Sequence, residues 1–374
     1  MEPSPHVPLT RAPDGWSAPA WDQLPAVRSV LGRPIEELLE ERPRLQPLDG
    51  FEAVYSDFVD YIIRCTHRIW EEKGVGLCRT HYSVDGRVLM LSGISVGCEE
   101  VVRNTLTSLA YYPDRSPVGE EVIWSEDAPG AFLSSHRLVS FATNLGDDPA
   151  IGTARGRRTG ILVIADCLCR DNLIIDEYIV RDNAQLARAF GEEPRQVALR
   201  QAVADRKGDQ ARHGWRAVEI ARVRAADPAQ VPADHPAAAI VAALHAAFEG
   251  QLFDELAALA SPSIDIRWPS GRDGVGKGYW IGCLIQLATA LTDTAFTVDH
   301  WAARPLPGGD VAVAVRWWFT GRHDLPGVWG PPTGREILVL AISHYRLRGG
   351  RIVEDMTVFD EVAILRQVEG GLGA

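Results

Sequence analysis

Acid–base chemistry needs a carboxylate or an imidazole in a protected place, and Asp355 has the most informative surroundings of the candidates. It lies in Ile352–Phe359, whose apolar pattern predicts a strand, and Thr357 follows two residues later. Successive side chains of a strand point to opposite faces, so Asp355 and Thr357 are expected on the same face. The pair could present a carboxylate and a hydroxyl to one pocket. A place at the pocket mouth or in a salt bridge is the alternative for Asp355.

Two histidines also stand in contexts that chemistry could use. His323 comes at the end of a predicted strand, ahead of a Pro-Pro-Thr turn at 331–333. A pocket histidine relays protons near neutral pH, whereas a turn histidine bonds to the backbone, and the sequence leaves both open. His136 lies in a predicted strand of the first half, where a single histidine is more often structural. It is the first-half candidate together with Glu177.

Tryptophans crowd the second half of the chain, and large rings that line a cavity suit a planar ligand. Trp317 and Trp318 are adjacent on a predicted strand, so only one of them can face a pocket. Two or three tryptophans are expected in the pocket lining and the others in the core. The substrate-binding candidates are Thr357, Trp268, Trp280, Trp301, Trp318 and Trp329.

The elements that must position these residues follow the same order in both halves. Each half begins with an amphipathic helix and continues with a series of strands. The predicted elements are a helix that opens near Phe51, a helix near Glu99–Leu109, strands over Gly160–Leu168 and Leu173–Val180, a helix over Ala237–Leu259, and strands over Ile337–Leu347 and Ile352–Phe359.

The two halves also repeat in sequence. With an offset of 178, residues 155–188 lie over residues 333–366 without a gap, and nine of the thirty-four positions are identical. Glu177 then corresponds to Asp355, and Asp182 corresponds to Asp360. Asp182 and Asp360 are each expected to cap the helix that follows. The pattern predicts a duplicated domain. The expected division is a proline-rich arm (1–47), a first domain (48–191), a charged connector (192–235) and a second domain (236–370).

The second half resembles the SnoaL-like polyketide cyclases of the nuclear-transport-factor-2-like (NTF2-like) superfamily. The resemblance rests on the run from Thr320 to Arg335, with its histidine and its Pro-Pro-Thr-Gly-Arg turn, and on Gly-Gly-Arg-Ile-Val-Glu at 349–354. It covers about residues 235–370, and the first half shares it only through the repeat. It implies an α+β fold of two tandem cone-shaped domains, each a curved antiparallel sheet backed by helices around an apolar pocket.

The resemblance also implies a chemistry. Members of the family close a polyketide ring by an intramolecular aldol reaction that needs no metal or cofactor, with a general base that removes a proton beside a carbonyl. This chain departs from the family at the catalytic position. The family carries a His-Trp-Asp run after Ile-Val-Glu, and here Thr357 occupies the place of that aspartate. In the first half the same place is Ile179.

Composition narrows the classes of partner. A formal net charge of −12 argues against nucleic acid or an anionic membrane, and the six cysteines show no zinc-ligand spacing, so no metal is expected. Neither a secretory signal nor a membrane-spanning run is visible, and the expected compartment is the cytoplasm. The expected partners are a small apolar or aromatic molecule and the chain's own two domains as a pseudo-dimer, with a homodimer as a further option.

Three functional hypotheses follow. The first is a cyclase, isomerase or hydrolase that acts on an apolar or aromatic substrate in the second domain, with Asp355 and His323 as the catalytic candidates. The second is a non-catalytic binding protein that keeps the pocket and has lost the family's aspartate. The third is a scaffold, which a pocket filled by the domain's own side chains would favour.

Overall fold

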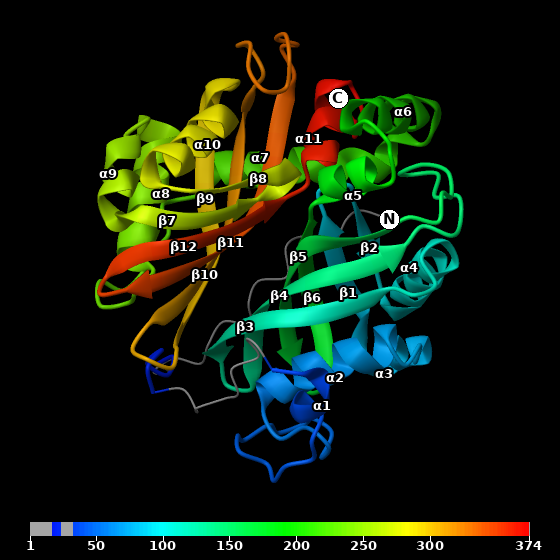
Figure 1. Ribbon diagram of the computed structural model, residues 1–374, viewed down its shortest axis with the longest axis vertical. Coiled ribbons are helices and arrows are strands. Elements are labelled where there is room, and N and C mark those ends of the chain that lie inside the picture. The colour runs from blue at the N-terminus through cyan, green and yellow to red at the C-terminus, as the bar shows by residue number, and fades with distance from the viewer. Residues whose placement is uncertain (1–16, 24–32, 374) are drawn as a thin grey trace. The chain divides into compact units, whose positions relative to one another are not determined.

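The computed structural model describes residues 17–23 and 33–373 and has an α+β fold. Two compact units divide the described residues: one contains those up to Met90 and Ile94–Ile179, and the other contains Leu91–Gly93 and the residues from Val180 onward. Each unit is built on a six-stranded mixed sheet with helices (Figure 1). Of the proline-rich arm expected over 1–47, residues 1–16 and 24–32 lie outside the described residues, and the described part holds the short helix α1 (Ile35–Leu38).

The first sheet has the strand order β2-β1-β6-β5-β4-β3. β1 runs parallel to β6, and β4 runs antiparallel to both β3 and β5. Its elements are α2 (Phe58–Trp70), η1 (Val75–Leu77), α3 (Cys78–His81), β1 (Tyr82–Met90), β2 (Gly93–Val96), α4 (Cys98–Tyr111), β3 (Ser116–Ala128), β4 (Ala131–Thr143), β5 (Arg158–Arg170) and β6 (Leu173–Arg181).

The second sheet has the order β8-β7-β12-β11-β10-β9, which is the same topology. Its strands are β7 (Ala260–Trp268), β8 (Arg272–Val275), β9 (Thr292–Pro305), β10 (Val311–Arg322), β11 (Glu336–Arg348) and β12 (Arg351–Phe359). The helices of this unit are α5 (Asn183–Ala189), α6 (Pro194–Lys207), η2 (Gln210–His213), α7 (Gly214–Ala225), α8 (Ala238–Gly250), α9 (Phe253–Leu259), η3 (Pro269–Gly271), α10 (Lys277–Thr289) and α11 (Glu361–Val368).

The repeat seen in the sequence is also a repeat of strand register. Glu177 on β6 lies opposite Val88 on the parallel strand β1, and Asp355 on β12 lies opposite Ile266 on the parallel strand β7. Both residues of the second pair are offset by 178 from those of the first. The two carboxylates therefore hold the same position in their respective sheets.

Two of the predicted helix boundaries are wrong. The helix predicted to open near Phe51 is α2, which begins at Phe58, because the Asp57 side chain accepts a hydrogen bond from the Asp60 amide and caps the helix there. The helix predicted over 237–259 is two helices. Gln251 takes a left-handed conformation with φ of 59°, which ends α8.

The predicted caps and the predicted final hairpin are confirmed. Asp182 accepts from the Gln185 amide at the start of α5, and Asp360 accepts from the Ala363 amide at the start of α11. Each cap follows directly on the last strand of its sheet, β6 or β12. The helix predicted near Glu99–Leu109 is α4.

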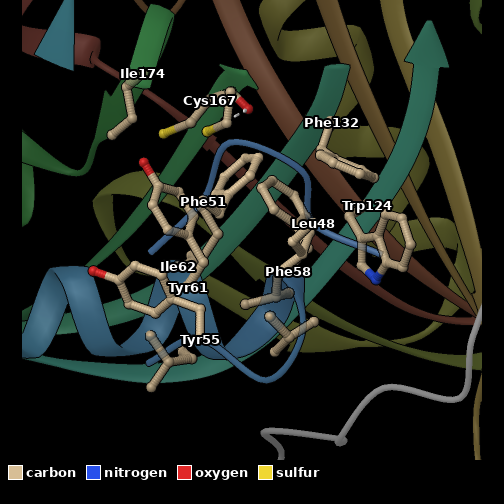
Figure 2. Packing of buried hydrophobic residues seen from close by; sticks show 14 of the residues in the cluster. Leu48, Phe51, Tyr55, Phe58, Tyr61, Ile62, Trp124, Phe132, Cys167 and Ile174 are labelled. Carbon is tan, nitrogen blue, oxygen red and sulfur yellow. Dashed lines mark hydrogen bonds between the residues drawn. The ribbon is translucent and has the colours of Figure 1, made fainter. Parts of the chain in front are cut away.

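The face of the first sheet beneath α2 is covered by an aromatic cluster. The ring of Phe51 lies 5.0 Å from that of Tyr61 and 5.9 Å from that of Phe132 between ring centroids, and Figure 2 shows these rings together. Leu48, Phe51 and Tyr55 come from the segment ahead of α2, and all three are buried. Because the Asp57 cap starts α2 after this segment, the segment lies outside the helix. Its side chains cover this face of the first sheet.

Candidate functional site

One face of the second sheet gathers polar side chains from neighbouring strands. On β11 and β12, Tyr345 lies opposite Asp355 and Ser343 lies opposite Thr357. Since directly opposed residues point to the same side and residues two apart share a face, all four side chains emerge together. We call this side of the sheet the Asp355 face. The same-face expectation for Asp355 and Thr357 is confirmed by the hydrogen bond between them.

The carboxylate of Asp355 is buried and receives three hydrogen bonds. Its Oδ2 accepts from Nε1 of Trp268 at 3.0 Å and from Nε1 of Trp280 at 2.5 Å. Its Oδ1 accepts from the Thr357 hydroxyl at 2.6 Å. The exposed fraction of Asp355 is 0 %. The charge is thus met entirely by uncharged donors.

Two different elements bring the indoles to this oxygen. β7 runs parallel to β12, with Ile266 opposite Asp355, so Trp268 lies two residues further along on the same face. Its ring also meets that of Phe359 edge-on, at 5.9 Å between centroids. Trp280 comes from the first turn of α10, which begins after Gly276. The left-handed φ of 111° at Gly276 is one that residues with a side chain rarely adopt.

A row of hydroxyl groups leads to Asp355 across the sheet. Thr357 donates to Asp355, and its oxygen lies 2.7 Å from the Ser343 hydroxyl oxygen. Because the Thr357 proton is already given to Asp355, Ser343 must be the donor to Thr357. Ser343 in turn accepts from Nε1 of Trp317 at 2.9 Å. Every proton in this row points toward the carboxylate.

The pKa values on this face follow from burial. Burial raises the pKa of Asp355 to about 6, against the hydrogen bonds from Thr357, Trp280 and Trp268, which favour the ionised form. Burial also raises the pKa of Tyr345, with the Asp355 charge as the second cause. Tyr345 therefore stays protonated, and the pKa of Asp355 lies nearer to neutral pH than that of a free aspartate.

The two adjacent tryptophans of β10 face opposite sides. Trp317 lies on the Asp355 face beneath α8, where its ring is 5.2 Å from that of Phe248. Trp318, which we expected at the pocket, lies on the other face. There it donates to Asp299 at 2.8 Å, and Arg222 of α7 lies 5.0 Å from its ring centroid. The register between β10 and β11 determines which of the two tryptophans lies on the Asp355 face. A long loop joins these strands, so the sequence alone does not predict their register.

His323 is not near Asp355. It directly follows Arg322, which pairs with Glu336 at the start of β11, whereas Asp355 pairs with Tyr345 nine residues further along that strand. Nine residues of strand span roughly 30 Å. The His323 ring lies 3.1 Å from the Thr333 hydroxyl, and its backbone bonds to Arg335, Thr333 and Gly334. Of the two roles considered for His323, this geometry is that of the turn anchor.

The remaining tryptophan candidates divide between the two ends of the sheet. Trp329 is buried next to His323, with 6.3 Å between the ring centroids. Trp301 on β9 lies opposite Val315, which itself lies opposite Ser343, so Trp301 belongs to the Asp355 face. It is half-buried. The Asp355 face therefore carries Trp268, Trp280, Trp301 and Trp317.

In the first unit, Glu177 keeps a smaller version of this arrangement. Its carboxylate accepts from the Tyr82 hydroxyl at 3.1 Å and lies 3.5 Å from Sγ of Cys167. His136 lies opposite Ala165, two residues from Cys167 on the same face, and burial lowers the pKa of His136 to about 4. His136 is thus neutral at pH 7. The aromatic cluster of α2 and the segment before it covers this face.

No group of three or more His, Cys, Asp or Glu side chains within residues 17–23 and 33–373 is arranged to hold a metal ion. No helix in the part of the chain that the structure describes is long and apolar enough to cross a membrane.

The strand order and the helix-covered sheet make the second unit an α+β domain, the fold class expected from the sequence. Residues 238–368 match the family model of the SnoaL-like polyketide cyclases. This confirms the resemblance drawn from the motifs at 320–335 and 349–354. No curated protein matches the chain significantly.

Several solved structures are similar to part of the chain. IdmH from Streptomyces antibioticus, described provisionally as a polyketide cyclase, is 27% identical, with 36% of this chain and 98% of IdmH covered and a TM-score of 0.31. TsrD from Streptomyces laurentii is 18% identical, with coverage of 38% and 98% and a TM-score of 0.31. AclR from Streptomyces galilaeus, described provisionally as a hydroxylase, is 19% identical, with coverage of 35% and 83% and a TM-score of 0.31.

Proposed function

We propose that the second unit is a small-molecule enzyme of the cyclase type in which Asp355 is the acid–base group. The observation that carries the proposal is a buried carboxylate on the Asp355 face that has no cationic partner in its hydrogen bonds and whose pKa burial raises to about 6. A general base works best when its pKa lies near the operating pH. The match of residues 238–368 to the polyketide cyclases supports an apolar or aromatic substrate with neighbouring carbonyl groups.

The proposed reaction is proton transfer followed by closure of a ring. Asp355 takes a proton from the carbon beside one carbonyl, and the electron pair left on that carbon forms a bond to the carbon of a second carbonyl in the same molecule. The alkoxide so formed takes the proton back from Asp355. No atom is lost or gained, and the scheme calls for no cofactor.

Thr357 links this proposal to the family's pattern. It stands where the family carries its catalytic aspartate, and its hydroxyl donates to Asp355 at 2.6 Å. The carboxylate has thus moved by two residues along β12, to a position on the same face. We propose that the acid–base function has moved with it.

The test uses three variants: Asp355→Asn, Thr357→Asp and the double variant. Each is screened by thermal shift against polycyclic aromatic, polyketide-like and lactone compounds, and turnover of every stabilising compound is followed by mass spectrometry. We expect Asp355→Asn to bind and not to turn over. The double variant, which restores a carboxylate at the family's position, should regain part of the activity. Full turnover by Asp355→Asn would exclude Asp355 as the base.

The second candidate function is a binding protein without catalysis. Its support is that the hydrogen bonds around Asp355 are complete apart from one lone pair of Oδ1, as in a network whose role is to hold the fold. A compound that stabilises wild type and Asp355→Asn alike, with no product from either protein, would favour this function.

We further propose that the two units arose by duplication. The identical strand order and the equal offset of the Glu177–Val88 and Asp355–Ile266 pairs support it. In the first unit the aromatic cluster occupies the corresponding face, so we assign the chemistry to the second unit.

A further inference from the structure

Two indole N–H groups meet at one oxygen atom of Asp355. Trp268 on β7 and Trp280 on α10 both donate to Oδ2, and both rings are buried, with exposed fractions of 3 % and 0 %. An indole N–H is a donor only, so neither bond can reverse its direction. A carboxylate oxygen offers two lone pairs, and the two indoles use both of those on Oδ2.

The other oxygen of Asp355 is placed differently. Oδ1 receives one hydrogen bond, from the hydroxyl of Thr357, which leaves it a second lone pair. A hydroxyl both donates and accepts, so the bond between Oδ1 and Thr357 can run in either direction. Only Oδ1 can therefore take up a proton without leaving a buried donor unpaired.

We infer that Trp268 and Trp280 are positioning residues that hold Oδ2 and so direct Oδ1 of Asp355 to the substrate. The inference rests on the proposed function, in which Asp355 is the base. Neither indole touches the reacting atoms. Each acts through the carboxylate, one from the sheet and one from the helix that follows β8.

The hydroxyl row completes the arrangement. When Oδ1 carries a proton, it donates to Thr357, the Thr357 hydroxyl turns toward Ser343, and the Ser343 hydroxyl turns toward Tyr345, its neighbour on the same face. A proton on Oδ2 would instead face two N–H groups that cannot turn away. A buried donor without an acceptor is costly, so the proton enters and leaves through Oδ1.

The arrangement predicts the effect of removing one N–H group while its ring position stays filled. Trp280→Phe and Trp268→Phe each withdraw one donor from the ionised form of Asp355, and the protonated form loses less. The pKa of Asp355 should rise by about one to two units for each variant, the range expected for a hydrogen bond to a charged group. Trp329→Phe is the matched control, because Trp329 is buried and its Nε1 has no hydrogen-bond partner among the described residues.

The experiment titrates Asp355 directly. Infrared difference spectra between each protein and its Asp355→Asn counterpart give the carboxyl band against pH, with circular dichroism to verify folding. We expect the midpoint to move upward in Trp280→Phe and Trp268→Phe and to stay at the wild-type value in Trp329→Phe. Midpoints that stay unchanged in both test variants would overturn the inference.

Activity then separates this inference from the proposed function. Where wild type turns over a substrate, the rising limb of kcat/KM against pH should move upward with the infrared midpoint. If the infrared midpoint of Asp355 moves but the protein turns over no substrate, the positioning of Oδ2 by the two indoles is supported and the proposed enzymatic function is contradicted. A limb that stays in place while the midpoint moves would show that another group is the base.

Discussion

The hydroxyl of Thr357 donates a hydrogen bond to Oδ1 of Asp355 at 2.6 Å, and the two residues lie two positions apart on β12. In the proposed function, Thr357 holds the family's carboxylate position and Asp355 supplies the carboxylate, so the two positions are in direct contact. Removing the threonine removes a hydrogen-bond donor from a buried charge, and it also leaves Ser343 without its acceptor. The pair therefore links the ionisation of Asp355 to the stability of the sheet.

Thr357→Val tests this link. Valine has nearly the shape of threonine, so the change deletes the hydroxyl and little else. We expect a loss of about 1–3 kcal/mol in the free energy of unfolding, because a buried donor and a buried charge both lose a partner. The pKa of Asp355 should rise as well. Urea unfolding and the infrared titration measure the two effects, and Thr357→Ser, which keeps the hydroxyl, should restore both.

The raised pKa of Asp355 makes stability depend on pH in a defined direction. The folded pKa is about 6, and that of an unfolded aspartate is 3.8. The folded state then binds more protons than the unfolded state between these values, so the free energy of unfolding falls as pH rises from about 4 to about 6. The contribution lost is about 3 kcal/mol, from about two pKa units at 1.36 kcal/mol each.

The check compares wild type with Asp355→Asn across this range. Asparagine does not titrate, so the difference in free energy of unfolding between the two proteins should change between pH 4.5 and pH 7. Asp182, whose pKa burial also raises to about 6, adds a slope of the same sign in both proteins and cancels in the difference. A constant difference would show that Asp355 titrates alike in the folded and unfolded states.

Much of the fold could be predicted from the sequence, because it depends on local patterns. The caps at Asp182 and Asp360, the final hairpin and the shared face of Asp355 and Thr357 follow from spacing alone. The start of α2 could not be placed, because the apolar spacing of Phe51 and Tyr55 fits a helix while the Asp57 cap starts it later. Periodicity does not separate a buried segment from a helix.

The candidate site was predicted in part, for a different reason. Asp355 follows from strand alternation applied to Thr357, the position where the resemblance places a catalytic aspartate. Its partners come from β7 and α10, which lie 75 to 87 residues earlier in the chain. Such pairings depend on the register between distant elements, which no local pattern encodes. The same limit explains the choice of Trp318 over Trp317. The sequence leaves two roles open for His323, and the length of β11 separates it from Asp355.

His323 should therefore affect stability and leave the titration of Asp355 unchanged. His323→Ala removes the ring that lies 3.1 Å from the Thr333 hydroxyl and packs against Trp329. We expect a loss of about 1–3 kcal/mol in the free energy of unfolding, and Thr333→Ala should cost less because the ring contact remains. The pH midpoint of Asp355 should equal that of wild type in both variants. A shifted midpoint would mean that the two sites communicate.

The aromatic cluster that covers the face of the first sheet leads to a prediction about Phe51. Phe51 is buried between the rings of Tyr61 and Phe132, so Phe51→Ala should leave a cavity and lower the free energy of unfolding of this unit by about 3–5 kcal/mol. Hydrogen exchange, followed by mass spectrometry for each unit, locates the loss. Val54→Ala is the control, because Val54 is 42 % exposed in the same segment and its truncation should cost little.

A cavity lined by aromatic rings stays dry and takes up small apolar molecules. Indole should therefore protect the first unit of Phe51→Ala and leave wild type unaffected, and equal protection of both would show that the cluster does not fill a pocket.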